Sequence, residues 1–171
     1  MKKRSILVSL IAVMAVIAIS CKKTKTPEEL LNEKVQAILT NNAAQLATDN
    51  EKIKKYITDN KLTASATPEG IYYVTEEAGL GVDYPTLISN VSSRYKGYLL
   101  DGKVFDQSAT AITFNLQQVI TGWTIGMQKF KRRSKGKLLI PSPFAYGANP
   151  PSASIPPNAV LIFDIELVDF N

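Results

Sequence analysis

The change of pattern near residue 68 constrains the fold of this chain more than any other feature. Before it, apolar residues recur every three to four positions from Leu30 to Ile57, which is typical of amphipathic helix. After it, glycines, prolines and β-forming residues dominate, and the Asp101-Gly102 pair between apolar runs indicates a β-hairpin. A chain of 171 residues has room for one globular domain with an attachment. The sequence therefore predicts a helical segment followed by a β-rich domain.

The first part is predicted to form two helices, near residues 27–41 and 43–60, with an interruption at Asn41-Asn42. Thr26 is a suitable N-cap for the first helix. The apolar stripe that these helices carry needs a partner. We favour packing on the chain's own domain. A homodimer through residues 27–60 and a groove for client chains are the alternatives.

The second part contains five short segments with strand character and one with helical character. Residues 150–157 hold four prolines and are expected to be irregular. The strands are predicted at 70–75, 87–100, 112–116, 137–140 and 160–170, and one helical segment is predicted at 117–130.

The composition excludes several kinds of catalysis. The chain has no histidine and one cysteine, Cys21. Ser-His-Asp and Cys-His catalysis, histidine metal sites and an internal disulfide are therefore excluded. We expect neither a metal nor a cofactor, so the chemistry must come from carboxylates, hydroxyls, amines or a shaped apolar pocket.

Residues 1–20 are predicted to be a secretory signal. Lys2, Lys3 and Arg4 precede an apolar stretch, residues 5–20, whose length of about 24 Å as a helix is less than a ~30 Å hydrocarbon core. The sequence Ala18-Ile19-Ser20-Cys21 resembles a bacterial lipoprotein box, which implies cleavage before Cys21 and lipidation of its thiol. The alternative is an uncleaved anchor helix.

This lipid anchor leads to an expected location in the bacterial cell envelope. Because residues 22–27 contain no acidic run, we expect the periplasmic face of the outer membrane. Without residues 1–20 the chain has 17 basic and 15 acidic residues, so its basic character is slight and no nucleic-acid partner is expected.

Five motifs occur in order in the second part. Together they resemble the FKBP family of peptidyl-prolyl cis-trans isomerases, over residues 68–171. The motifs are Tyr95-Lys96-Gly97-Tyr98, Asp101-Gly102-Lys103-Val104-Phe105-Asp106, Val119-Ile120-Thr121-Gly122-Trp123, Phe144-Ala145-Tyr146-Gly147, and Ile155-Pro156-Pro157 followed by Phe163 in the last strand.

The resemblance implies an α+β fold, in which a twisted antiparallel sheet of about five strands wraps around one short helix. Together with the lipoprotein box and the helical pattern, it leads us to expect three parts of the chain: a lipoprotein signal peptide (1–20), a lipidated tether with a helical stalk (21–67), and an isomerase domain (68–171).

The family's pocket positions carry over to ten residues of this sequence. The backbone N–H of Ile120 and the hydroxyl of Tyr146 would bind client carbonyls, and Asp106 would orient the pocket. Ile112 stands where the family commonly has an aromatic residue. The implied catalytic residues are Tyr95, Phe105, Asp106, Ile120, Trp123, Tyr146 and Phe163, and the implied substrate-binding residues are Ile112, Val119 and Ile155.

Peptide-bond rotation suits a chain without a nucleophile or a base. The barrier of ~18–20 kcal/mol reflects amide resonance, which the twisted transition state loses. That state is less polar at the carbonyl, so a dry apolar pocket favours it over the planar ground state. The residues also allow plainer interpretations: Phe105, Val119 and Phe163 as core residues, and Asp106 as a turn residue.

We therefore predict an isomerase that acts on proline-containing polypeptide clients among exported proteins. The alternative is a membrane-tethered holdase chaperone or binding module with weak or no isomerase activity, in which the helical stripe grips clients. A basic run from Lys129 to Lys137 is interpreted as a solvated turn before a strand, with contact to anionic lipid or acidic clients as the alternative.

Overall fold

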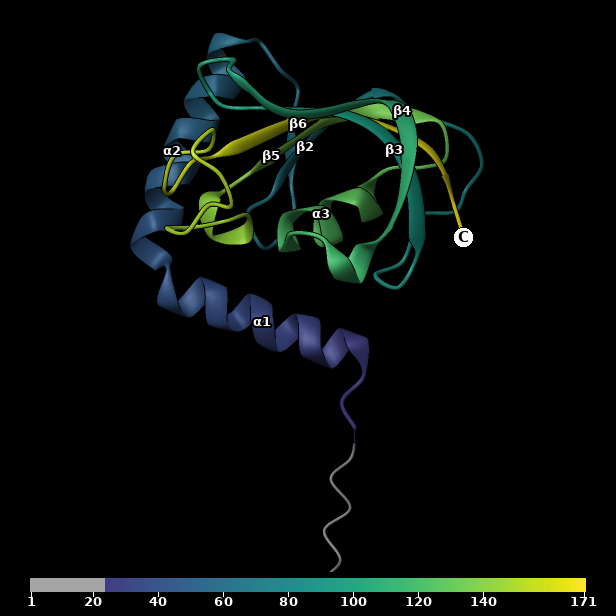
Figure 1. The fold of residues 1–171 in the computed structure, drawn as a ribbon, viewed down its shortest axis with the longest axis horizontal. Coiled ribbons are helices and arrows are strands. Elements are labelled where there is room, and N and C mark those ends of the chain that lie inside the picture. Colours follow the sequence, from purple (N-terminus) through teal and green to yellow (C-terminus); the bar gives the residue numbers. More distant parts are fainter. Residues whose placement is uncertain (1–23) are drawn as a thin grey trace, which may run out of the picture.

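The computed structural model describes residues 24–171, so the predicted signal segment and Cys21 lie outside the described residues. Two helices, α1 (Pro27–Asn41) and α2 (Ala43–Asp59), precede a sheet that wraps around the short helix α3 (Thr121–Gly126) (Figure 1). The strands are β1 (Ser65–Ala66), β2 (Tyr72–Glu77), β3 (Asn90–Tyr98), β4 (Val104–Asn115), β5 (Ser134–Ile140) and β6 (Leu161–Phe170), and three short 3-10 turns are η1 (Leu116–Gln118), η2 (Met127–Lys129) and η3 (Ser142–Phe144).

The two predicted helices are confirmed almost to the residue. Thr26 caps α1 through a capping box, in which its hydroxyl accepts the Glu29 N–H and the Glu29 carboxylate accepts the Thr26 N–H. At the other end, Asn42 donates from its backbone N–H and its side-chain amide to the Ile38 carbonyl, at 3.1 and 3.0 Å. These local bonds end α1 and separate it from α2.

The apolar stripe of α1 and α2 packs on the chain's own domain. Val35 and Leu46 are buried in the core that contains Trp123. Ile53 is fully buried in a second cluster with Val74 and Leu139 of the sheet. This packing is the interpretation that the sequence favoured.

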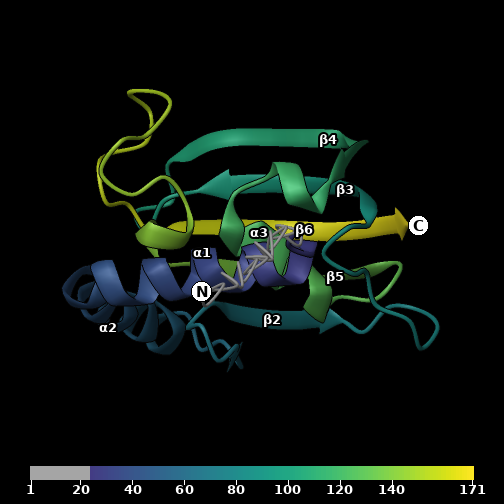
Figure 2. The same cartoon turned by 90° about the horizontal axis from the view of Figure 1, so that it is seen from below.

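The six strands form one antiparallel sheet in the order β1-β2-β5-β6-β3-β4. Figure 2 shows β4, β3, β6, β5 and β2 side by side, with α3 over one face. The hairpin predicted at Asp101-Gly102 joins β3 to β4, and Gly102 adopts a φ of +84° in its turn. The final strand, β6, lies in the middle of the sheet between β5 and β3.

The β2 and β3 strands are displaced by at most three residues from the predicted 70–75 and 87–100, and the larger differences concern three other segments. The strand expected at 112–116 is the end of a longer strand, β4, which pairs with β3 from Asn115 back to Val104. Likewise, β5 begins at Ser134 instead of residue 137, and β1 adds a two-residue strand at the edge. Hydrogen bonds from a neighbouring strand extend these elements beyond what their own residue pattern indicates.

The single helical segment predicted at 117–130 is wrong, because the structure divides it into η1, α3 and η2. Val119 and Ile120 between η1 and α3 have extended backbone, with ψ of 176° and 145°. The Thr124 hydroxyl donates to the Leu116 carbonyl at 2.6 Å and closes this bend. The break presents Val119 and Ile120 to the hollow between α3 and the sheet.

The basic run forms ion pairs with acidic residues of neighbouring strands. Arg132 pairs with Asp169, and Lys135 pairs with Glu77. Lys137 pairs with Glu76 and Asp164. Throughout residues 24–171, no helix is both long enough and apolar enough to span a bilayer.

Candidate active site

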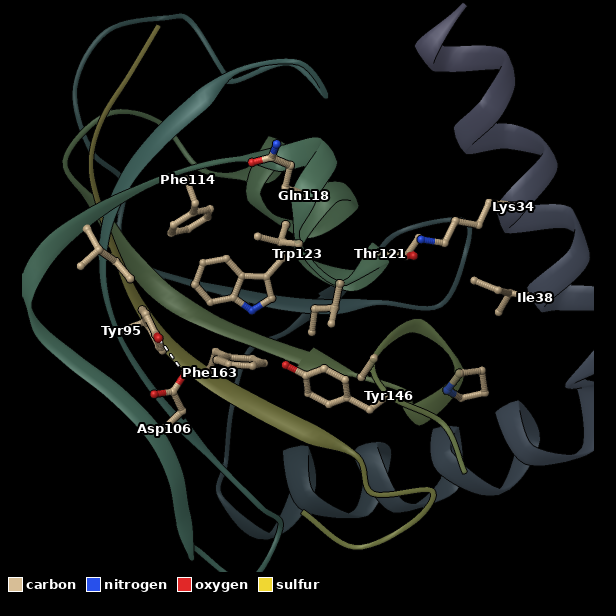
Figure 3. Close-up of a pocket in the computed structure, with 15 residues that line it drawn as sticks. Lys34, Ile38, Tyr95, Asp106, Phe114, Gln118, Thr121, Trp123, Tyr146 and Phe163 are labelled. Carbon is tan, nitrogen blue, oxygen red and sulfur yellow. Dashed lines mark hydrogen bonds between the residues drawn. The ribbon is translucent and has the colours of Figure 1, made fainter. Parts of the chain in front are cut away.

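A cavity of about 740 Å³ opens between α3, the concave face of the sheet, the η3 loop and α1 (Figure 3). Eight of the ten site residues predicted from the sequence line it, although their elements are far apart in the chain. These eight are Tyr95, Asp106, Ile112, Val119, Ile120, Trp123, Tyr146 and Phe163.

Trp123 forms the floor of the cavity, with 5% of its surface exposed. It lies in the first turn of α3, which turns the indole toward the sheet (Figure 3). Three rings meet it edge to face: Tyr95 at 5.3 Å, Phe114 at 5.1 Å and Phe163 at 5.1 Å between centroids. Such pairs favour fixed geometry, so the floor is rigid and apolar.

Tyr95 and Asp106 form the polar edge of the cavity. The Tyr95 hydroxyl donates to Asp106 Oδ2 at 2.7 Å, from β3 to the neighbouring β4. Burial, and then the hydrogen bond and negative charge of Asp106, raise the pKa of Tyr95 to about 12. Tyr95 therefore stays protonated and holds the carboxylate in place over the physiological range.

Tyr146 follows η3 and extends its hydroxyl into the cavity (Figure 3). Burial, and then the charge of Asp106, raise the pKa of this phenol. In residues 24–171, its hydroxyl forms no hydrogen bond to another side chain or backbone group. It is a neutral donor available to a ligand.

The remaining wall is aliphatic. Val119, Ile120 and Ile112 line it. Ile120 is the N-cap of α3, so its backbone N–H lies outside the helical ladder. The cavity thus has an aromatic floor, aliphatic walls and few polar groups, which is the composition of a site for an apolar ligand with an oriented amide.

Phe105 and Ile155 do not line the cavity. Phe105 lies behind it and packs edge to face on Phe163, at 5.5 Å between ring centroids. Ile155 is buried in the core. Both residues support the lining instead of contributing to it.

Sequence reasoning missed seven lining residues. Phe114 had a signal, because it stands two residues after Ile112 in an alternating strand, where residues i and i+2 lie on the same face. Lys34 and Ile38 of α1 had none, since the motifs are confined to the second part of the chain. The other missed residues are Gln118, Thr121, Pro143 and Ala145.

The η3 loop is tied to α2 by a buried carboxylate. Asp49 of α2, which is fully buried, accepts from the backbone N–H and the hydroxyl of Ser142 at 2.8 and 2.6 Å. Pro143, Ala145 and Tyr146 follow directly and line the cavity. As for metals, residues 24–171 contain no group of three or more acidic, cysteine or histidine side chains that could hold an ion.

The comparisons with known proteins agree with this geometry. Residues 83–168 match the family model for FKBP-type peptidyl-prolyl cis-trans isomerases. The FKBP-type peptidyl-prolyl cis-trans isomerase FkpA of Escherichia coli K12 is 40% identical over 147 residues, which cover 83% of this chain and 53% of that protein. A probable FKBP-type peptidyl-prolyl cis-trans isomerase of Haemophilus influenzae is 38% identical over 132 residues, covering 75% of this chain and 54% of that protein.

Solved structures extend the likeness to the fold. A peptidyl-prolyl cis-trans isomerase from Pseudomonas syringae pv. tomato has a TM-score of 0.63 and 32% identity, over 76% of this chain and 96% of that chain. FkpA from Escherichia coli also has a TM-score of 0.63 and 32% identity, over 86% of this chain and 74% of that chain. The chain spans about half the length of the curated relatives it matches. By its motifs, its wrapped sheet and these matches, the chain belongs to the FKBP-type peptidyl-prolyl cis-trans isomerase family.

Proposed function

We propose that this protein catalyses cis-trans isomerisation of X-Pro bonds in polypeptide clients. The observation that carries the proposal is the cavity over Trp123, in which apolar walls surround the Tyr95–Asp106 pair and the Tyr146 hydroxyl. Uncatalysed X-Pro exchange takes ~10–100 s, which is slow enough to delay folding. A catalyst that only binds and desolvates the bond is sufficient for this reaction.

The mechanism follows from the change in polarity during rotation. The planar amide is polar and well solvated, whereas the twisted amide has lost resonance. The proline ring rests on Trp123, so the bond leaves water for an apolar environment that favours the twisted form. The Ile120 N–H and the Tyr146 hydroxyl donate to client carbonyls on either side and hold the chain while the bond turns.

Asp106 has an orienting role. Its carboxylate is fixed by the Tyr95 hydroxyl at 2.7 Å and lines the cavity in which the client carbonyl would rotate. The negative charge disfavours approach of the carbonyl oxygen from the side of Asp106, which biases the direction of rotation. It transfers no proton, so no histidine or metal is needed.

The test is an isomerisation assay on residues 22–171, which include every element of the described fold. Tyr146→Phe removes one hydroxyl from the cavity and is expected to lower kcat/KM roughly 3- to 10-fold, the effect of one hydrogen bond. The matched control is Tyr73→Phe, because Tyr73 packs on Phe130 in the sheet and lies outside the cavity. A folded protein that does not accelerate X-Pro exchange would refute the proposal.

The holdase alternative has less surface available than the sequence suggested. Its stripe residues Val35, Leu46 and Ile53 are buried within the chain. The holdase alternative predicts that Trp123→Phe still suppresses client aggregation. It also predicts that Leu30→Glu, at a position of α1 that is 54% exposed, does not.

The proposal extends to the membrane. We infer that Cys21 is lipidated, as the Ala18-Ile19-Ser20-Cys21 sequence supports. We further infer that the folded part faces the periplasm from the outer membrane, since residues 22–27 carry no acidic run. Labelled palmitate should be incorporated by the wild-type chain but not by Cys21→Ala, which should leave the membrane fraction. Unchanged fractionation of the variant would contradict the anchor.

A homodimer through residues 27–60 stays a prediction. The apolar residues of this segment left exposed are few, Leu30 being the most prominent. Sedimentation equilibrium with wild type and Leu30→Glu distinguishes a dimer seam, which the charge would disrupt, from a monomer, which it would not change.

A further inference from the structure

The helix α1 contributes to the wall of the active-site cavity. Lys34 and Ile38 project from it toward the mouth beside Thr121 (Figure 3). The same helix supplies Leu30 and Leu31 to a second cavity, of about 210 Å³. The two cavities share lining residues at Lys34, Val119 and Thr121, so they adjoin along α1.

Charge is unevenly distributed along this continuous surface. Lys34 is the one basic residue that lines either cavity, and Asp106, across the floor from it, is the one acidic residue (Figure 3). The carboxylate next to Lys34 in the chain, that of Glu33, pairs with Lys25 instead. Within residues 24–171, the Lys34 amine has no carboxylate partner within 4.0 Å.

These features suit an extended client chain. Successive residues of such a chain advance by ~3.3–3.6 Å, so residues beside a proline on Trp123 reach the rim of the cavity. Apolar side chains fit the second cavity against Leu30, Leu31 and Leu87. A negative side chain at the rim would meet the Lys34 amine.

We propose that α1 extends the client-binding surface and that Lys34 is a specificity-determining residue, which selects polypeptides with Asp or Glu close to the isomerising proline. This inference rests on the proposed isomerase function, because it assigns the client's flanking residues to the rim of the same site. Lys34 takes no part in bond rotation.

The expected preference is modest and depends on salt. An exposed ion pair changes affinity roughly two- to five-fold. Screening over ~10 Å at 0.1 M salt should reduce that preference as salt is raised. The peptide with Ala gives the reference rate for each variant, so the preference is the ratio of charged to neutral peptide and does not depend on the variant's overall activity.

The experiment compares proline peptides that differ only by Glu, Ala or Lys, placed either just before the proline or two residues after it. The ratio of kcat/KM for Glu over Lys is measured for wild type, Lys34→Gln and Lys34→Glu at low and high salt. Lys54→Glu is the matched control, because it changes the charge of the helical segment equally but lies outside both cavities. Comparing variants on the same peptides cancels each peptide's own cis content.

Wild type is expected to prefer Glu at one position or both. Lys34→Gln should abolish the preference, Lys34→Glu should reverse it, and Lys54→Glu should retain it. The inference would be overturned if wild type and Lys34→Glu had the same Glu-to-Lys ratio at both peptide positions while the neutral peptide was still isomerised. That result would leave the proposed isomerase function intact. If no peptide is turned over, peptide titration of the fluorescence of Trp123, the single tryptophan, measures the same ratio as binding.

Discussion

At the scale of single residues, Tyr95 shows how surroundings give one side chain two tasks. Its ring packs on Trp123, while its hydroxyl holds Asp106 at 2.7 Å. Tyr98, three residues on, uses the same chemistry on the opposite side, where its hydroxyl donates to Asp164 at 2.8 Å and burial raises its pKa. Tyr95 therefore belongs to the cavity, whereas Tyr98 is buried in the second core cluster.

The pKa of Tyr95 predicts a specific loss of stability at high pH. In the folded state the pKa of Tyr95 is raised to about 12, whereas an ordinary tyrosine has a pKa of 10.0. The stabilisation is therefore complete below pH 10 and is lost as the pH rises from 10 to 12. Asp106→Asn removes the anionic acceptor but not the burial, so the pKa of Tyr95 should fall part of the way toward 10.0.

Ultraviolet titration of tyrosinate, with Tyr95→Phe to assign the group, measures this shift. Asp164→Asn is the matched control, because it acts on Tyr98 and should leave Tyr95 unchanged. A Tyr95 titration that is the same in wild type and Asp106→Asn would show that the hydrogen bond contributes nothing.

At the scale of elements, the bond between α2 and η3 explains why the cavity has a fixed rim. Asp49 and Ser142 are 93 residues apart in the chain, yet two hydrogen bonds join them in a buried environment. A third, from Gln45 at 2.8 Å, satisfies the other carboxylate oxygen. The loop that carries Tyr146 is thus anchored to a helix outside the isomerase motifs.

Asp49→Ala is expected to lower the free energy of unfolding by about 1.5–3 kcal/mol or more, because it leaves the Ser142 N–H unpaired in a buried site. Urea unfolding measures the loss. Asp59→Ala, an exposed position on the same helix that pairs with Lys55, should change stability by less than ~0.5 kcal/mol. Equal effects of the two substitutions would refute the anchoring role.

At the scale of the whole molecule, the helical segment and the sheet share their core. Val35 and Leu46 join the cluster around Trp123, and Ile53 joins Val74, Tyr98 and Leu139. The stalk that the sequence predicted at 21–67 therefore has extensive packing on the domain at 68–171. We expect the two to unfold as one unit, since the same apolar surface covers both.

Ile53→Ala tests this unity. The side chain is fully buried, so its truncation should lower the free energy of unfolding by about 2–5 kcal/mol. Trp123 fluorescence and helical circular dichroism should lose their signals at the same urea concentration. If the helical signal were lost at a lower urea concentration than the fluorescence, the helices and the sheet would be two independent units. The control is Ile88→Ala, a surface change at a position that is 54% exposed.

The sequence by itself determined what depends on near neighbours. The bounds of α1 and α2 follow from Thr26 and Asn42, whose hydrogen bonds reach only three or four residues. The Asp101-Gly102 hairpin is equally local, and the family's pocket positions identified eight residues of the cavity lining. The irregular stretch at 150–157 needed only its prolines.

The tertiary structure decided what depends on contacts between distant segments. It broke the helix expected at 117–130, because burying Leu116 and closing the Thr124 bond required an extended Ile120. It placed Phe105 and Ile155 behind the lining and brought Lys34 and Ile38 of α1 to the mouth. Helical periodicity reports that a face is buried but not which surface buries it, so only the packing of α1 could reveal that this face borders the active site.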